Sequence, residues 1–198
     1  MDGYMRRLDG GKPVVGIPYV LLVHKFFPMF RTFFEKLGCQ VLLSPETDEE
    51  LIALAQSFTQ AETCYPVKLM YGHMAWHAER RPDYLFLPAV LTMKHKSSKV
   101  HHNYGCVYMQ TAMRMLYESM GLEKSGMRLL NPVFHLDFGQ EAMAGEMIAV
   151  GRSMGHSAEA CKQALMKASA AVRSQEAKVE ALGRELLPGG KTAVRRRL

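Results

Sequence analysis

The chain has 198 residues, 48% of them hydrophobic, and a formal net charge of +6 at pH 7. This length and apolar fraction fit one domain of ordinary size or two small ones, and they argue against disorder over most of the chain. The four cysteines are too few and too widely spaced for a disulfide scaffold or a zinc ribbon, and no segment is apolar for long enough to span a membrane. Because the N-terminus does not resemble a signal peptide, we expect a cytoplasmic protein.

The first part of the chain alternates between short apolar runs and amphipathic segments. Gly38 is expected to end a helix, and Thr47 or Asp48 to cap the next one. The pattern predicts, in order, strand 13–23, helix 26–37, strand 39–44, helix 49–58, helix 66–79 and strand 83–88. This order favours a parallel sheet with helices on its faces, whose ligands gather beyond the carboxyl ends of the strands.

The second part predicts fewer strands and more helix. We expect a helix from about 107 to 120, a short strand 127–132, a connection 133–138, and helices 140–154 and 158–182. The fold class is therefore α/β: a Rossmann-like, three-layer α/β/α arrangement with a short parallel sheet, followed by a C-terminal helical segment. We divide the chain into an N-terminal extension (1–12), a Rossmann-like lobe (13–130), a helical segment (131–187) and a basic tail (188–198) that resembles the truncated start of a second lobe.

Cys64 precedes Pro66 by two residues, at the start of a run with helical spacing. Because proline is tolerated in the first helical turn, Cys64 is expected at or just before a helix N-terminus. A thiolate there faces free backbone N–H groups and the positive end of the helix dipole, which suits metal, cluster or redox chemistry. The alternative is a half-buried structural cysteine, as most cytosolic cysteines are.

Cys106 repeats this situation, because it also ends a loop just before a predicted helix. Two helix starts can direct two thiolates to one point even when they are far apart in sequence. Of the other cysteines, Cys39 lies inside a predicted strand and is expected in the core. Cys161 lies in the first turn of a helix, either exposed or packed.

A basic cluster falls in the loop 92–105, which is expected on the functional edge of the sheet. No recognition motif or aromatic stacking pattern accompanies the cluster, so a solvated or anion-facing loop is favoured over a specific nucleic-acid site. Its members are Lys94, His95, Lys96, Lys99, His101 and His102.

Several motifs match a known family in order. They are Gly16-Ile17-Pro18, Phe27-Pro28, Phe33-Phe34, Leu37-Gly38, Glu62-x-Cys64-x-Pro66-x-Lys68-x-x-x-Gly72-His73, Asp83-x-x-Phe86-x-Pro88 and Asn103-Tyr104-x-Cys106. Over about residues 13–187 the chain resembles the domain associated with activators of 2-hydroxyacyl-CoA dehydratases, the CoA-substrate-specific enzyme activase domain. It is also similar to cluster-carrying dehydratase subunits and double-cubane-cluster reductases.

The resemblance implies an iron–sulfur protein of anaerobic metabolism that receives an electron from an ATP-hydrolysing activase partner. It makes Cys64 and Cys106 ligands of a 4Fe–4S cluster, the metal centre of the protein. The residues that it places around the cofactor are Tyr65, Lys68, His73 and Asn103.

Two features depart from the family pattern. Val107 stands where relatives carry a proline, and relatives continue into a second lobe with further ligands. Two cysteines do not complete a four-thiolate cluster. The remaining ligands would come from a second lobe or subunit, a second copy in a homodimer, or water; otherwise no cluster is bound.

Three functions remain open from the sequence. The first is an iron–sulfur electron-transfer or activation component. The second is a non-catalytic α/β interaction module that docks an ATP-dependent activase subunit. The third is a dehydratase-type subunit acting on an acyl-CoA, in which Lys94, Lys96 and Lys99 would face the CoA phosphates.

Overall fold

A computed structural model describes residues 10–60, 62–93, 95, 97 and 103–186. In order, the chain forms β1 (Val14–Ile17), α1 (Val23–Lys36), β2 (Gln40–Leu43), α2 (Glu49–Phe58), α3 (Tyr65–Arg80), β3 (Tyr84–Phe86), β4 (Ala89–Thr92), α4 (Val107–Ser119), the short 3-10 helix η1 (Leu122–Ser125), β5 (Arg128–Leu130), β6 (Val133–His135), α5 (Gln140–Ser153) and α6 (Ala158–Leu186).

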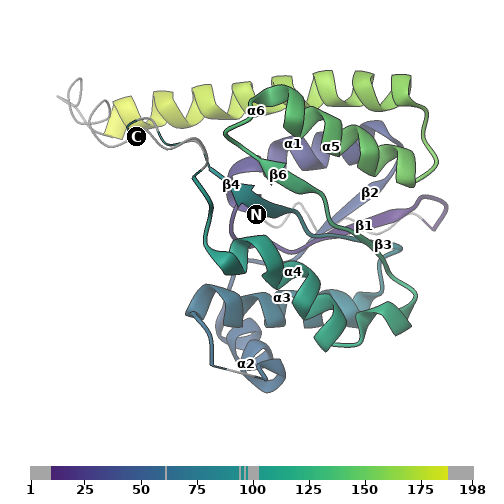
Figure 1. Ribbon diagram of the computed structural model, residues 1–198, viewed down its shortest axis with the longest axis vertical. Helices are drawn as coiled ribbons and strands as arrows, with labels where there is room; N and C mark the ends of the chain where they lie inside the picture. The colour runs from purple at the N-terminus through teal and green to yellow at the C-terminus, as the bar shows by residue number, and fades with distance from the viewer. Residues whose placement is uncertain (1–9, 61, 94, 96, 98–102, 187–198) are drawn as a thin grey trace.

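The main sheet has four parallel strands in the order β2-β1-β3-β5, with helices on both faces and the long helix α6 at the end of the chain (Figure 1). The predicted α/β class is confirmed. Val15 pairs with Val41 of β2 on one side and with Tyr84 of β3 on the other. The strand order therefore reverses between β1 and β3: β2 lies on one side of β1, and β3 and β5 lie on the other. In such folds, ligands usually bind in the crevice outside the point where the strand order reverses.

The second sheet, β4 with β6, corrects two predictions. The connection expected over 133–138 contains β6, and the loop expected from position 92 begins only after that residue. The ladder of β3 and β5 continues past two prolines, because Leu87 N donates to Leu130 O and Ala89 N donates to Pro132 O, both at 2.9 Å. Pro88 and Pro132 look like strand ends in the sequence, yet here they divide one bent strand pair.

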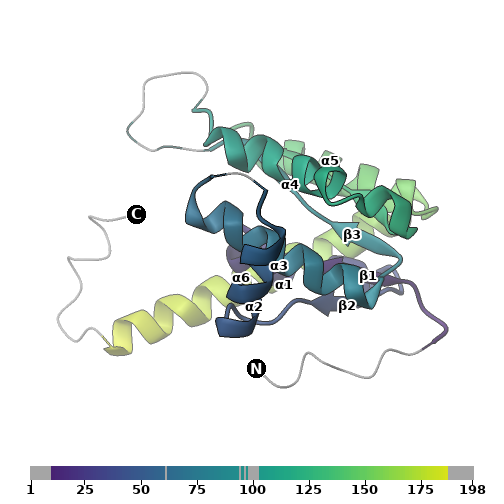
Figure 2. The ribbon, with the colours of Figure 1, turned by 90° about the horizontal axis from the view of Figure 1, so that it is seen from below.

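One face of the sheet is covered by α1, α5 and α6 (Figures 1 and 2). Its core is aromatic: the ring of Phe30 lies 4.8 Å from that of Phe86 and 6.1 Å from that of Phe134. All three rings are fully buried. Burying each of them stabilises the fold by about 1.5–3 kcal/mol, so this layer is the main hydrophobic core.

The opposite face is covered by α3 and α4, whose buried side chains form a second core cluster with Leu85 of β3. Met70 and Met74 of α3 and Leu116 of α4 belong to this cluster. Helix α2 packs on the outside of α3, and Gly72 allows the close approach, since a Cβ at that position would lie 2.5 Å from Leu51 O.

Helix boundaries follow the predictions where capping residues are present. Asp48 caps α2, because its Oδ1 accepts from Leu51 N at 2.8 Å, and α2 has the predicted bounds. Gly38 follows α1 with φ of +81°, as a C-terminal glycine should. Helix α6 continues past 182 to Leu186, because the helix runs on through Gly183. Among the described residues, no helix combines the length and apolarity needed to cross a bilayer.

Candidate functional site

Cys64 and Cys106 occupy the same structural position on two different helices. Each is the N-cap residue, Cys64 of α3 and Cys106 of α4, and each is exposed. The Cys64 carbonyl accepts from Val67 N and Lys68 N at 3.0 and 3.1 Å. The carbonyl of Cys106 receives the equivalent pair of N–H groups from the first turn of α4. In both cases the backbone makes the capping bonds and the thiol takes no part in them.

The two helix starts lie at the same edge of the molecule. Helices α3 and α4 pack against each other and run in the same direction, so that their N-terminal ends are neighbours in both views (Figures 1 and 2). This is the edge at which the parallel strands of the main sheet end. We call it the cysteine edge, defined by Cys64, Cys106 and the flanking residues Tyr65, Tyr104 and Val107.

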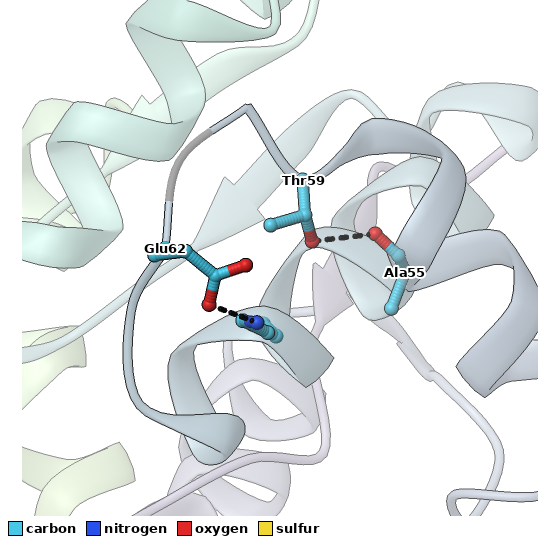
Figure 3. A network of polar contacts seen from close by, with 4 residues as sticks. Ala55, Thr59 and Glu62 are labelled. Carbon is cyan, nitrogen blue, oxygen red and sulfur yellow. Dashed lines mark hydrogen bonds and ion pairs between the residues drawn. The ribbon is translucent and has the colours of Figure 1, made fainter.

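The loop before Cys64 is fastened at both of its ends (Figure 3). Thr59 Oγ1 donates to Ala55 O at 2.7 Å in the last turn of α2, and Lys68 Nζ of α3 lies 2.7 Å from Glu62 Oε2. The Glu62 side chain is 94% exposed, so this ion pair contributes little to stability. Lys68, a predicted site residue, therefore lies one turn inside the helix with its ammonium directed to Glu62.

The loop before Cys106 is held against β4. Met93 N donates to Asn103 O and Gly105 N donates to Leu91 O, both at 2.8 Å. A Cβ on Gly105 would lie 3.3 Å from Val90 O, a tight contact with the backbone of β4. Asn103, another predicted site residue, is thus part of the return to α4 through its backbone. The basic positions 94, 96, 99, 101 and 102 lie outside the described residues.

Exposed apolar and aromatic residues flank the two cysteines along the chain. Tyr65, Tyr104 and Val107 are 56%, 67% and 61% exposed. Tyr65 and Val107 directly follow the two cysteines, each as the first residue of its helix. The predicted site residue Tyr65 is therefore at the cysteine edge.

His73 is not at the cysteine edge, although the motif includes it. His73 lies nine positions after Cys64, which is about 13 Å along the axis of α3. Its Nδ1 lies 2.7 Å from Ser44 Oγ and its Nε2 lies 3.3 Å from Thr47 Oγ1. Burial lowers the pKa of His73 to about 4, so the ring is neutral at physiological pH. The structure gives His73 a place in the link between α3 and the end of β2.

His77, one turn further along α3, is also fully buried. Burial lowers the pKa of His77 to about 3, an effect that the Ile17 backbone partly offsets. Neither ring nitrogen has a hydrogen-bond partner within the described part of the chain.

A polar cluster at the end of β4 and β6 was missed by the sequence analysis. Thr92 Oγ1 donates to Asp137 Oδ1 and lies 3.5 Å from His135 Nδ1. The ring of His135 also stacks on that of Phe138 at 4.7 Å. Recognising 133–135 as a strand parallel to β4 would have brought these side chains together, because parallel strands end at the same edge.

A small hollow beneath α4 is lined only by apolar residues. It lies between the loop after β1 and the first two turns of α4, where Leu21 has a φ of +49°. Its lining residues are Val20, Leu21, Leu22, Val23, Pro88, Val90, Met109 and Met113. Without a polar group to orient a ligand, it has the character of a packing gap.

The other two cysteines are buried on the α1 side of the sheet, as predicted for Cys39. Burial raises the pKa of Cys39 to about 11 and also raises the pKa of Cys161. Both are therefore protonated and shielded. Across the described ranges, no group of three or more His, Cys, Asp or Glu side chains is arranged to hold a metal ion.

The fold and the paired thiols define a Rossmann-like α/β domain with two exposed, helix-capping cysteines at one edge. The chain belongs to the family described as "CoA enzyme activase uncharacterised domain" (DUF2229), whose model matches residues 14–197. Membership in an activase-associated family indicates an enzyme partner. Neither a curated protein nor a solved structure gives a significant match to the sequence. The closer likeness to dehydratase subunits and double-cubane-cluster reductases stays a prediction.

Proposed function

We propose that the chain is an iron–sulfur component of an activase-dependent enzyme system, with Cys64 and Cys106 as two cluster ligands. One observation carries the proposal: two exposed cysteines cap two neighbouring helices that start at the same edge. Thiolates are the usual ligands of iron–sulfur clusters, and the positive ends of two helix dipoles favour an anionic cluster. An exposed edge also suits exchange of electrons with a partner.

The donor set of this chain fits half of a four-thiolate site. The remaining cysteines, Cys39 and Cys161, are buried on the other face of the sheet and do not reach the cysteine edge. Further ligands would therefore come from outside this sequence. An activase-related partner is the natural source, and it would also cover Tyr65, Tyr104 and Val107, whose exposed apolar surfaces suit a protein contact.

When bound, such a cluster supplies single-electron transfer. The chain's own residues would have three tasks. The backbone of the first turns of α3 and α4 fixes the two thiols. Lys68 and Glu62 would help to orient the loop that precedes Cys64 through their exposed ion pair. The aromatic side chains beside the thiols limit the access of water once a partner is in place.

The test is iron and acid-labile sulfide per chain after anaerobic purification and reconstitution, with the visible absorption that thiolate-bound clusters show near ~400 nm. We expect iron in the wild type and its loss in Cys64→Ser and in Cys106→Ser. Cys161→Ala removes a thiol that is not at the edge, and it should retain iron if circular dichroism shows that it is folded. Equal iron in the wild type and the Cys64→Ser/Cys106→Ser double variant would overturn the proposal.

A docking module without a cluster is the second candidate, supported by the exposed side chains of the cysteine edge. It predicts binding of an ATP-hydrolysing activase subunit by protein that contains no iron. Tyr104→Ser and Val107→Ser should then weaken binding at least tenfold, while Met166→Ser, an exposed apolar position on α6, should not. Binding that depends on loaded iron would favour the first candidate.

A further inference from the structure

The first half of helix α6 packs against the body of the protein, and its second half is exposed to solvent. Cys161, Ala164 and Ala168 are buried against the body of the protein, with Leu165 and Val172 partly buried beside them. From position 173 to position 186 every residue except Gly183 is exposed. Figures 1 and 2 show this end of the helix projecting away from the rest of the molecule.

The apolar stripe does not end where the packing ends. Counting from Cys161, the stripe advances by alternate steps of four and three residues along the whole helix, which is the spacing of a coiled-coil seam. The projecting half is apolar at three of the four seam positions that it contains. The stripe consists of Cys161, Leu165, Ala168, Val172, Gln175, Val179, Leu182 and Leu186.

The exposed members of this stripe form a surface that we call the α6 seam, consisting of Val179, Leu182 and Leu186. They are 59%, 53% and 68% exposed. An isolated helix in water gains nothing from such a stripe, because most helical stability in proteins comes from packing an apolar face. The seam is therefore a surface for a second helix of matching periodicity.

The charged residues beside the seam indicate which helix would pair with it. Lys178 and Glu185 occupy the same flanking position one heptad apart, next to Val179 and Leu186. In an antiparallel helix pair, equivalent flanking positions of the two helices face each other, so Lys178 of one copy meets Glu185 of the other, twice. A parallel pair would place Lys178 opposite Gly183 and form no such contact. We propose that the α6 seam pairs antiparallel with the α6 seam of a second copy of this chain.

The geometry of the projecting half agrees with this pairing. Gly183 has nothing within 4 Å of a Cβ built on it, so its surface is open and a second helix can approach closely there. The charges on the outer side are already engaged, since Arg184 lies 3.2 Å from Glu180 of the same helix. Antiparallel pairing centred between Val179 and Leu182 places the two bodies at opposite ends of the pair.

The same pairing orients the cysteine edges. The free end of α6 points to the side of the molecule on which α3 and α4 begin (Figure 1). Each body of the dimer would therefore turn its cysteine edge toward the space that holds the paired helices. Because α6 lies on the opposite face of the sheet, its pairing leaves Cys64 and Cys106 uncovered.

The seam spans about one heptad, which is short compared with stable coiled coils, so the dimer should be weak and dependent on concentration. Sedimentation velocity over a hundredfold range of protein concentration is the test. We expect a shift from monomer to dimer in the wild type and at least tenfold weaker association in Val179→Glu and in Leu182→Glu. Both positions are exposed, so the fold should be retained.

Ala177→Glu, on the outer side of the same helix, is the matched control and should dimerise as the wild type does. The direction of pairing has its own readout. With Cys64 and Cys106 replaced by serine, the Val179→Cys/Leu182→Cys double variant should form a disulfide-linked dimer readily, and Val179→Cys alone should not. A monomer at every concentration, equal loss in Ala177→Glu, or efficient cross-linking of Val179→Cys alone would overturn the proposal.

Discussion

Gly16 of β1 lies directly against the ring of His77 of α3. A Cβ built on Gly16 would stand 2.8 Å from His77 Nδ1 and 2.7 Å from Pro82 Cγ. The strand and the helix therefore touch at a point where even a methyl group does not fit. His77 is fully buried, so its ring is enclosed on its other sides as well.

Gly16→Ala should lower the free energy of unfolding by roughly 1–3 kcal/mol, the usual cost of overpacking a core. Urea denaturation followed by circular dichroism measures this change. Gly10→Ala is the control, because nothing lies within 4 Å of a Cβ at that position. A Gly16→Ala variant as stable as the control would show that α3 moves away from β1 at little cost.

Gly72→Ala and Gly145→Ala can be compared directly, because both glycines lie inside helices. Alanine favours a helix over glycine by about 1 kcal/mol, so Gly145→Ala, which meets nothing within 4 Å, should raise the thermal midpoint. Gly72→Ala should lower it, because its Cβ would lie 2.5 Å from the backbone oxygen of Leu51. Stabilisation by both substitutions would contradict the close packing of α2 on α3.

Acid should destabilise the fold through the two buried histidines. Their folded pKa values, about 4 for His73 and about 3 for His77, lie below the ordinary value of 6.5. Below pH 6.5 the unfolded chain takes up protons that the folded chain does not, so stability is lost as the pH falls toward 4. The loss is at most about 1.4 kcal/mol per pH unit for each histidine.

Urea titrations at several pH values between 7 and about 4 measure this slope. His77→Leu should reduce the slope of stability against pH by the contribution of one histidine, because leucine takes up no proton. His156→Gln is the control for removing a histidine elsewhere. If His77→Leu leaves the slope unchanged, the buried ring of His77 is not a source of acid sensitivity.

Ser44→Ala should cost about 1–3 kcal/mol of stability, the penalty for leaving buried polar partners unsatisfied. Ser44 is 1% exposed, and its Oγ accepts from Tyr19 N and lies 2.7 Å from His73 Nδ1. Ser57→Ala is the matched control, because Ser57 is exposed and donates to Leu54 O in its own helix. Thermal unfolding compares the two, and equal midpoints would contradict a structural role for the Ser44–His73 contact.

The sequence predicted best where a local signal acts alone. The start of α2 was predicted to the residue, because an N-cap such as Asp48 satisfies backbone donors wherever it occurs. The helix-start position of Cys64 followed from Pro66 in the same way. Local chemistry of this kind does not depend on the rest of the fold.

The sequence predicted least where distant segments meet. Pro88 and Pro132 indicated strand ends, and only the pairing of β4 with β6 shows that both strands continue. The burial of His73 and His77 depends on where α3 lies between β1 and α2, which periodicity alone does not give. The Thr92–Asp137 contact joins residues 45 positions apart and has no local signal.

Two of the four cysteines are exposed and two are buried, so the rates at which their thiols are labelled report on local and global unfolding of the chain. Cys64 and Cys106 should react with a thiol reagent in the folded state, whereas Cys39 and Cys161 should react only when their surroundings separate. Cys39 is covered by the β2 and α1 layer, but Cys161 is covered by the packing of α6, where a Cβ on Gly151 would collide with its Sγ. The ratio of the two slow labelling rates would therefore tell whether α6 detaches by itself or only when the whole domain unfolds.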